Sequence, residues 1–310
     1  MSDSQGVLAH VINLDRARDR LAHMATSLER LEVAHRRQPA CTPQQVHLAS
    51  AALGLRFGAR LRPLERACFL SHAGAWQQIA TGSAHWGLVL EDDAILARDA
   101  AEGIRFAARA SDAELVRMET LGNTSPRIRL RPDVRGRGEA AGFALHRLLG
   151  RTIAAGAYML HRQAAGRLLE ELRGMAEISL AVDEYLFLDP AICPLRQQHL
   201  WPAVSIQSNV LAGVPRAELP PAWALAGLPL FASCMRHEEE APERKFKVRK
   251  SVGHSLRRWL TGHGRRPCPL SPAGPLLLPA GMGEAPPATM PARLASNDPD
   301  RQPAAHPRDV

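Results

Sequence analysis

The chain has 310 residues, of which 45% are hydrophobic, and this is enough apolar material for one large α/β domain or two modest ones. The formal net charge of +8 is unevenly distributed, because residues 241–266 carry +8 and residues 1–240 carry only +1. A nearly neutral body argues against a nucleic-acid-binding fold with a basic face.

Strand-like and helix-like segments alternate along the chain. Short apolar runs predict strands, and apolar residues at intervals of three and four predict amphipathic helices. In chain order we expect a strand at 7–14, a helix around 21–31, a helix from 63 to 79, strands at 86–90 and 115–118, a loop at 122–142, a strand at 154–160 and a helix at 163–173. This alternation predicts an α/β fold with a mostly parallel sheet, helices on both faces and ligands at the carboxyl ends of the strands.

The last 70 residues of the chain differ in composition from the body at residues 1–240. Residues 241–261 interleave cations with apolar side chains such as Phe246 and Trp259, as an interfacial amphipathic helix does, although a solvated basic helix or linker would look the same. Residues 262–310 are rich in Pro, Ala and Gly without periodicity, which predicts a disordered tail.

Targeting signals and cysteine chemistry are not evident in the sequence. Asp3 precedes a short apolar run broken by His10 and Asn13, unlike a secretory signal, and no segment approaches the roughly 20 apolar residues of a membrane span. The five cysteines are far apart and form no CxxC pair. We therefore expect a cytoplasmic protein with reduced thiols.

Three consecutive carboxylates follow the predicted strand at 86–90. They are Glu91, Asp92 and Asp93. Since alternate side chains of an extended segment point to opposite sides, Glu91 and Asp93 can converge while Asp92 points away. A hard divalent cation would neutralise the converging pair and accept diphosphate oxygens on its other side. The alternative is an acidic loop that caps the next helix.

Several motifs occur in an order that resembles a known family. They are VINLDRARDR at 11–20, ERACFLSHAGAW at 65–76, LVLEDDAIL at 88–96, AYMLHRQAAGRLL at 157–169, VDE at 182–184 and PAVSIQ at 202–207. This ordered set resembles glycosyltransferase family 25, the lipooligosaccharide biosynthesis galactosyltransferases and their collagen-modifying relatives. The resemblance covers roughly residues 7–208, and the Arg-rich composition favours its bacterial branch.

The resemblance implies a GT-A-like nucleotide-sugar-binding fold. It further implies inverting transfer of a hexose, galactose in the lipooligosaccharide branch, from a UDP-sugar to a lipooligosaccharide or other glycan acceptor. It makes residues 1–240 the catalytic domain and adds a divalent cation, manganese, held by Glu91 and Asp93. Such an enzyme would work at the inner face of a membrane, so residues 241–266 are a candidate for peripheral contact with anionic lipid.

The resemblance also assigns the remaining site residues. Asp183 matches a family acid and is the expected catalytic base, with Glu184 as its substitute. His199 could be a third metal ligand or a surface histidine. The expected donor-binding residues are Asn13, Leu14, Arg16, Arg20 and Asp92.

Four further matching positions have acceptor or structural roles that the sequence leaves open. They are Glu65, Ser71, His72 and Gln207. Without the resemblance, residue chemistry favours Glu65 as an acidic residue in the first turn of a helix and His72 as a packed or capping histidine. The role of Gln207 does not follow from the sequence.

Two other classes of protein stay open from the sequence. A metal-dependent phosphohydrolase could use the same acidic triplet, although the chain lacks a DxDxT-type nucleophile motif. A non-enzymatic protein that binds anionic polymers is supported only by the basic segment at 241–266.

Overall fold

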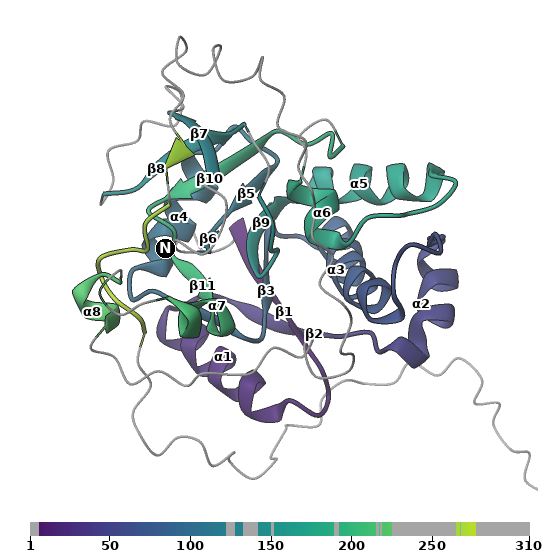
Figure 1. The fold of residues 1–310 in the computed structure, drawn as a ribbon, viewed down its shortest axis with the longest axis horizontal. Helices are drawn as coiled ribbons and strands as arrows, with labels where there is room; N and C mark the ends of the chain where they lie inside the picture. The colour runs from purple at the N-terminus through teal and green to yellow at the C-terminus, as the bar shows by residue number, and fades with distance from the viewer. Residues whose placement is uncertain are drawn as a thin grey trace, which may run out of the picture.

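The structure is a computed structural model that describes residues 6–121, 128–132, 142–149, 152–188, 192–214, 217, 219–224, 265–266 and 268–276. Over these ranges the chain forms a nine-stranded sheet, a three-stranded sheet and helices on both faces of the larger sheet (Figure 1). The basic segment predicted at 241–261 lies outside the described residues.

The large sheet has the order β12-β7-β8-β10-β5-β9-β3-β1-β2. Strands β2, β1, β3, β5, β10 and β7 run in one direction, and β9, β8 and β12 run in the opposite direction, which confirms the predicted α/β fold with a mostly parallel sheet. The strands are β1 (Val7–Asn13), β2 (His35–Pro39), β3 (Trp86–Glu91), β5 (Leu115–Arg117), β7 (Ile128–Pro132), β8 (Ala144–Leu148), β9 (Ala157–His161), β10 (Gln197–Trp201) and β12 (Arg265–Arg266).

The small sheet and the helices complete the described fold. The small sheet has the order β4 (Ala94–Leu96), β11 (Ser205–Gln207), β6 (Glu119–Thr120). The helices are α1 (Arg18–Arg30), the 3₁₀ helix η2 (Pro43–Gln45), α2 (Val46–Leu53), α3 (Pro63–Thr81), α4 (Ala100–Ala110), α5 (Arg162–Gly174), α6 (Val182–Phe187), α7 (Ser208–Gly213) and α8 (Pro221–Ala224).

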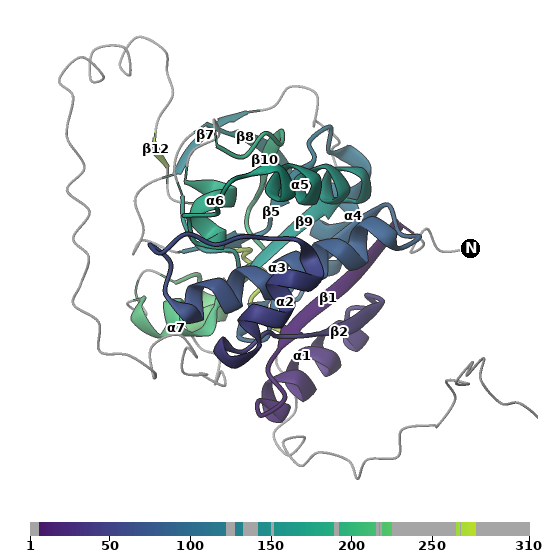
Figure 2. The same ribbon diagram turned by 90° about the vertical axis from the view of Figure 1, so that its right-hand side faces the viewer.

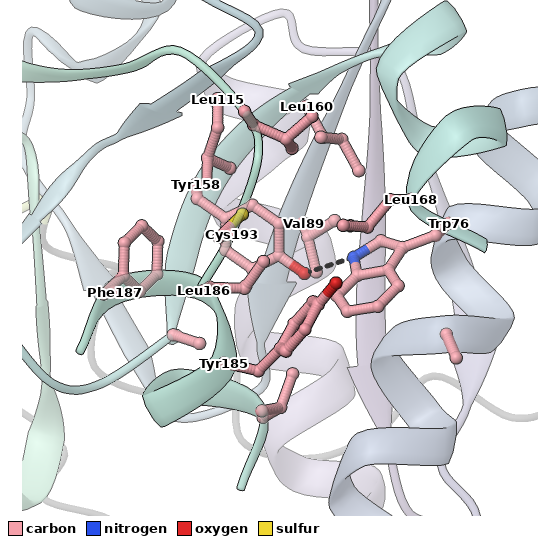
Figure 3. Close-up of a cluster of buried hydrophobic side chains, with 14 of the residues drawn as sticks. Trp76, Val89, Leu115, Tyr158, Leu160, Leu168, Tyr185, Leu186, Phe187 and Cys193 are labelled. Atoms are coloured by element: carbon pink, nitrogen blue, oxygen red, sulfur yellow. Dashed lines mark hydrogen bonds between the residues drawn. The ribbon is translucent and has the colours of Figure 1, made fainter. Parts of the chain in front are cut away.

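Two hydrophobic cores lie on opposite faces of the large sheet. Because side chains alternate along a strand, Val89 packs against α3, α5 and α6, whereas Leu88 and Leu90 pack on the face covered by α1 and α4. Figures 1 and 2 show these two groups of helices on opposite sides of the strands. In the first core, Trp76 of α3 meets Tyr158 of β9 (Figure 3).

The helix α3 forms one wall of the site described below. It begins at Pro63, whose missing N–H costs nothing in a first turn. Glu65 accepts a hydrogen bond from the backbone N–H of Arg62 at 2.8 Å and also pairs with its guanidinium. Glu65 thus caps the first turn of α3, as its residue chemistry predicts.

Two regions differ from the sequence predictions. Strand β7 lies within the loop predicted at 122–142, because β8 offers a hydrogen-bonding edge that local composition does not reveal. Residues 265–266 and 268–276, predicted as disordered tail, lie against the body through β12 and through bridges of Leu270 to Ala203 and of Pro275 to Ala97. The predicted disorder is therefore wrong for these residues.

Among the described residues, no helix combines the length and the apolar character that crossing a membrane requires.

Helix α3 and strand β3 approach each other closely at Gly87. A Cβ atom there would lie 2.2 Å from Cγ1 of the buried Ile79. Gly87→Ala should lower the free energy of unfolding by about 1–3 kcal/mol, because the added methyl overpacks the core. Denaturant unfolding measures this change. Gly174→Ala is the matched control, since a Cβ there meets nothing within 4 Å. Equal stability of the two variants would contradict the prediction.

Candidate active site

The carboxyl ends of β1, β2 and β3 meet at one edge of the large sheet. Asn13 is in register with Pro39, and Ile12 is in register with Glu91. A pocket of about 170 Å³ opens at this edge. Eight of the predicted site residues line it: Leu14, Arg16, Arg20, Ser71, His72, Glu91, Asp92 and Asp93.

Asp92 is held by the loop that follows β1. Its carboxylate accepts a hydrogen bond from Asn13 Nδ2 at 2.7 Å and pairs with Arg20 Nη1 at 3.2 Å. Asn13 also donates to the carbonyl of Ala17 and accepts from Arg37 Nε. The side chain of Asn13 is buried, so it positions the loop and Asp92 and does not line the pocket.

Glu91 lies between two donors from distant parts of the chain. His72 Nε2 lies 3.2 Å from Oε1, and Gln207 Nε2 donates to Oε2 at 2.8 Å. Burial, followed by the charges of Asp183 and Asp92, raises the pKa of Glu91 to about 7. The structure therefore gives Gln207 the role that the sequence left open, which is to hold this carboxylate.

A buried chain of hydrogen bonds orients His72. Trp76 Nε1 donates to the Tyr158 hydroxyl at 2.7 Å (Figure 3), and that hydroxyl lies 2.9 Å from His72 Nδ1. Burial lowers the pKa of His72 to about 4, so the imidazole is neutral near pH 7. In the neutral form Tyr158 donates to Nδ1 and His72 Nε2–H donates to Glu91.

Asp93 is the least compensated acid of the site. Burial and the charges of Glu91 and Asp92 raise its pKa to about 7. Among the described residues, no donor reaches its buried Oδ1 atom. The half-buried Glu91 and the buried Asp93 repel each other, and Asp93 has an unpartnered oxygen, so the pair fits a hard divalent cation.

Glu119 and Arg117 also lie near this site, and the sequence analysis missed them. Glu119 accepts a hydrogen bond from the backbone N–H of Gly156 at 2.9 Å and lies 3.7 Å from Arg117 Nη2. Burial raises the pKa of Glu119 to about 7 although Arg117 opposes this rise. A Cβ at Gly156 would lie 2.6 Å from Gln207 Nε2 and 2.9 Å from Glu119 Oε2, so only glycine fits between these groups.

Asp183 and Glu184 stand at the start of α6. Asp183 accepts hydrogen bonds from the backbone N–H groups of Ala154 at 3.1 Å and Glu184 at 2.9 Å. It does not line the pocket, but its charge contributes to the raised pKa of Glu91. Glu184 accepts from the backbone N–H of Ala181, as a capping residue does.

Two more predicted residues have structural contacts. Ser71 donates to the carbonyl of Ala67 and accepts from the backbone N–H of Cys41, both at 2.8 Å. His199 is fully buried in β10 and does not line the pocket; its Nδ1 atom lies 2.7 Å from the carbonyl of Leu200. The structure thus provides no support for His199 as a third ligand.

The sequence comparison defines the class of protein. The family described as "Glycosyltransferase family 25 (LPS biosynthesis protein)" matches residues 8–186, more than half of the chain. The chain is therefore a glycosyltransferase, and it belongs to glycosyltransferase family 25. This confirms the resemblance seen in the ordered motifs.

A curated relative agrees with this assignment. The chain is 29% identical over 227 residues to the lacto-N-neotetraose biosynthesis glycosyltransferase LgtE of Neisseria meningitidis serogroup B, covering 66% of this chain and 78% of the relative.

Similar solved structures include mannose-1-phosphate geranyltransferase from Thermus thermophilus, with 16% identity, coverage of 64% of this chain and 74% of the other, and a TM-score of 0.35. Mouse xyloside xylosyltransferase 1 has 13% identity, coverage of 63% and 72%, and a TM-score of 0.32. At these TM-scores the likenesses carry no argument about function.

His199 makes stability sensitive to acid. Burial, followed by the charge of Arg117, lowers its pKa from 6.5 to about 3. Below pH 6.5 the unfolded chain binds a proton at His199 that the folded chain excludes, so the contribution of His199 to the free energy of unfolding falls as pH falls from 6.5 toward 3. Burial lowers the pKa of His10 and His72 to about 4, which adds to this loss, whereas the raised pKa of Glu91, Asp93 and Glu119 acts in the opposite direction. Compared with the wild type, His199→Gln should therefore lose less stability, or gain more, between about pH 7 and pH 4.

Thermal melts between about pH 7 and pH 4 measure the effect. His47→Gln is the control, because it replaces a histidine that is exposed on α2 and lies outside the core. If His199→Gln and the wild type showed the same pH dependence of the melting temperature, the predicted contribution of His199 would be contradicted.

Proposed function

We propose that the protein is a metal-dependent inverting glycosyltransferase that moves a hexose, galactose, from a UDP-sugar to a lipooligosaccharide or other glycan acceptor. The observation that supports it best is the pair of the half-buried Glu91 and the buried Asp93 at the carboxyl end of β3, with Arg16 and Arg20 lining the same pocket. Family membership and the relative named for lacto-N-neotetraose biosynthesis favour transfer over phosphohydrolysis or polymer binding.

The donor side of the reaction uses residues around the pocket. Glu91 and Asp93 would hold a divalent cation, Mn²⁺ in this proposal, which supplies positive charge for the leaving diphosphate. Arg16 and Arg20 bring further positive charge to the pocket, and Leu14 adds an apolar wall. Asn13 keeps Asp92 and Arg20 in place, so the cationic side of the pocket is built before the donor binds.

The acceptor side requires a base that removes a proton from the attacking hydroxyl. Asp183 is proposed for this role because each of its oxygens accepts one backbone hydrogen bond and keeps a further lone pair. The two backbone bonds fix the carboxylate, so it can accept the proton without reorienting. Glu184 points instead to the start of α6.

Contact with a membrane surface is a further part of the proposal. All three lysines of the chain, Lys245, Lys247 and Lys250, lie with six arginines between residues 241 and 266. Anionic lipid attracts such a segment by about 1 kcal/mol per cation. A cytoplasmic enzyme with a lipid-linked acceptor could be retained at the inner face of the membrane in this way.

Asp93→Asn should abolish transfer, measured as release of UDP from UDP-galactose with and without Mn²⁺. It should not lower the melting temperature of the metal-free protein, because removing one of two repelling buried charges relieves electrostatic strain. Asp112→Asn, an exposed acid before β5, is the control and should retain the activity. Normal turnover by Asp93→Asn, or by the wild type in a strong chelator, would contradict the metal pair.

Asp183→Asn should lower the transfer rate by roughly 10²-fold or more while the affinity for UDP-sugar and Mn²⁺ stays unchanged, since the side chain acts on the acceptor. Steady-state kinetics and calorimetric titration with UDP separate the two effects. A parallel fall of donor affinity and rate would make Asp183 a donor-site or structural residue.

Replacing the three lysines by glutamine should weaken binding to phosphatidylserine vesicles roughly 100-fold, at about 1 kcal/mol per cation. Sedimentation with vesicles at two salt concentrations measures this, and high salt should weaken wild-type binding as well. The control replaces Arg18, Arg60 and Arg105, three exposed cations of the body, by glutamine. Equal vesicle binding by both triple variants would contradict a specific role of the basic segment.

A further inference from the structure

A thiol, an imidazole and a carboxylate converge on one wall of the pocket. Cys68 and His72 are four residues apart on α3 and therefore lie on the same face of the helix. Glu91 reaches the same point from the end of β3. One donor atom from each of these three side chains lies within 4.8 Å of the other two.

This set of donor atoms differs in chemistry from the acidic pair. Glu91 and Asp93 offer only oxygen, which suits hard cations. Thiolate and imidazole are softer donors that favour Zn²⁺ and similar ions. Bonds of about 2.0–2.3 Å place tetrahedral ligands roughly 3.3–3.8 Å apart, so atoms that lie within 4.8 Å of one another need to approach by about 1.5 Å at most.

The surroundings of His72 support metal binding. A metal-bound histidine needs an acceptor for the N–H of its other ring nitrogen. The Tyr158 hydroxyl lies 2.9 Å from Nδ1, and its two lone pairs can accept from both Trp76 and His72. For Nε2 to present a lone pair, His72 must change tautomer: Nε2 gives up its proton, Nδ1 gains one, and the Tyr158 hydroxyl turns so that its oxygen accepts from Nδ1–H.

The local charge also favours a cation. The carboxylates around Cys68 are those of Glu91, Asp183, Asp93 and Glu65. Their combined negative charge attracts a dication. Metal binding would form a metal–sulfur bond and release the thiol proton to solvent.

We propose that Cys68, His72 and Glu91 form a binding site for Zn²⁺, with the fourth position open to the pocket that all three residues line. Because the site shares Glu91 with the acidic pair, Zn²⁺ and the hard cation compete for that carboxylate. Inhibition of transfer by Zn²⁺ is a consequence that rests on the proposed function, whereas the binding itself does not.

The test uses the full chain, freed of metal and kept reduced. Titration with Co²⁺ should produce a thiolate-to-metal charge-transfer band, and Zn²⁺ should abolish it at one equivalent. Cys68→Ser should remove the band. It should also weaken Zn²⁺ binding by at least roughly 10–100-fold, which is the typical effect of removing a hydrogen-bond partner of a metal ligand. His72→Gln should weaken it similarly. Cys41→Ser is the control, because Cys41 lines the same pocket outside the three-residue cluster.

A second measurement needs no variant. Zn²⁺ should protect Cys68 from alkylation while Cys41 reacts at its metal-free rate, as read by mass spectrometry of the two peptides. Absence of the charge-transfer band, its persistence in a folded Cys68→Ser variant, or equal labelling of Cys68 with and without Zn²⁺ would overturn the proposal. Since none of these readouts uses sugar transfer, the site and the transferase function can fail separately.

Discussion

The cost of taking carboxylates out of water governs the architecture around the end of β3. Burial disfavours the ionised form of Glu91, Asp93 and Glu119, and the raised pKa of each group expresses that cost. The protein compensates unequally. Both oxygens of Glu91 have donors, whereas Oδ1 of Asp93 has none among the described residues.

Most of the surrounding elements are placed to meet this cost. Helix α3 brings His72, β11 brings Gln207, β9 supplies Tyr158, and the backbone of Gly156 lies just before β9. None of these groups is charged near neutral pH. Glu91 is therefore supported by neutral donors and retains much of its negative potential, which makes it attractive to cations.

The part of the fold that follows from local patterns could be predicted from the sequence. Hydrophobic spacing indicates β1, α1, α3 and β3, and the position of Glu91 and Asp93 after an apolar strand places them at the ligand-binding edge. Glu119 could not be found in this way, because it lies in β6, which has only two residues and is too short to produce a periodic signal. The roles of Gln207 and Asn13 depend on contacts between residues far apart in the chain, which spacing does not reveal.

Composition misled the prediction for residues 268–276. Their Pro-rich sequence is typical of disorder, yet Ser271 is buried and accepts a hydrogen bond from Trp223 through its carbonyl. This segment also joins Leu96 and Ala203 through backbone hydrogen bonds. Synthesis on the ribosome runs from the amino end, so β4 and the residues after β10 emerge well before their partners at 268–276. The catalytic body cannot complete its native contacts until this late segment has left the exit tunnel, and until then the strands it covers are available to chaperones.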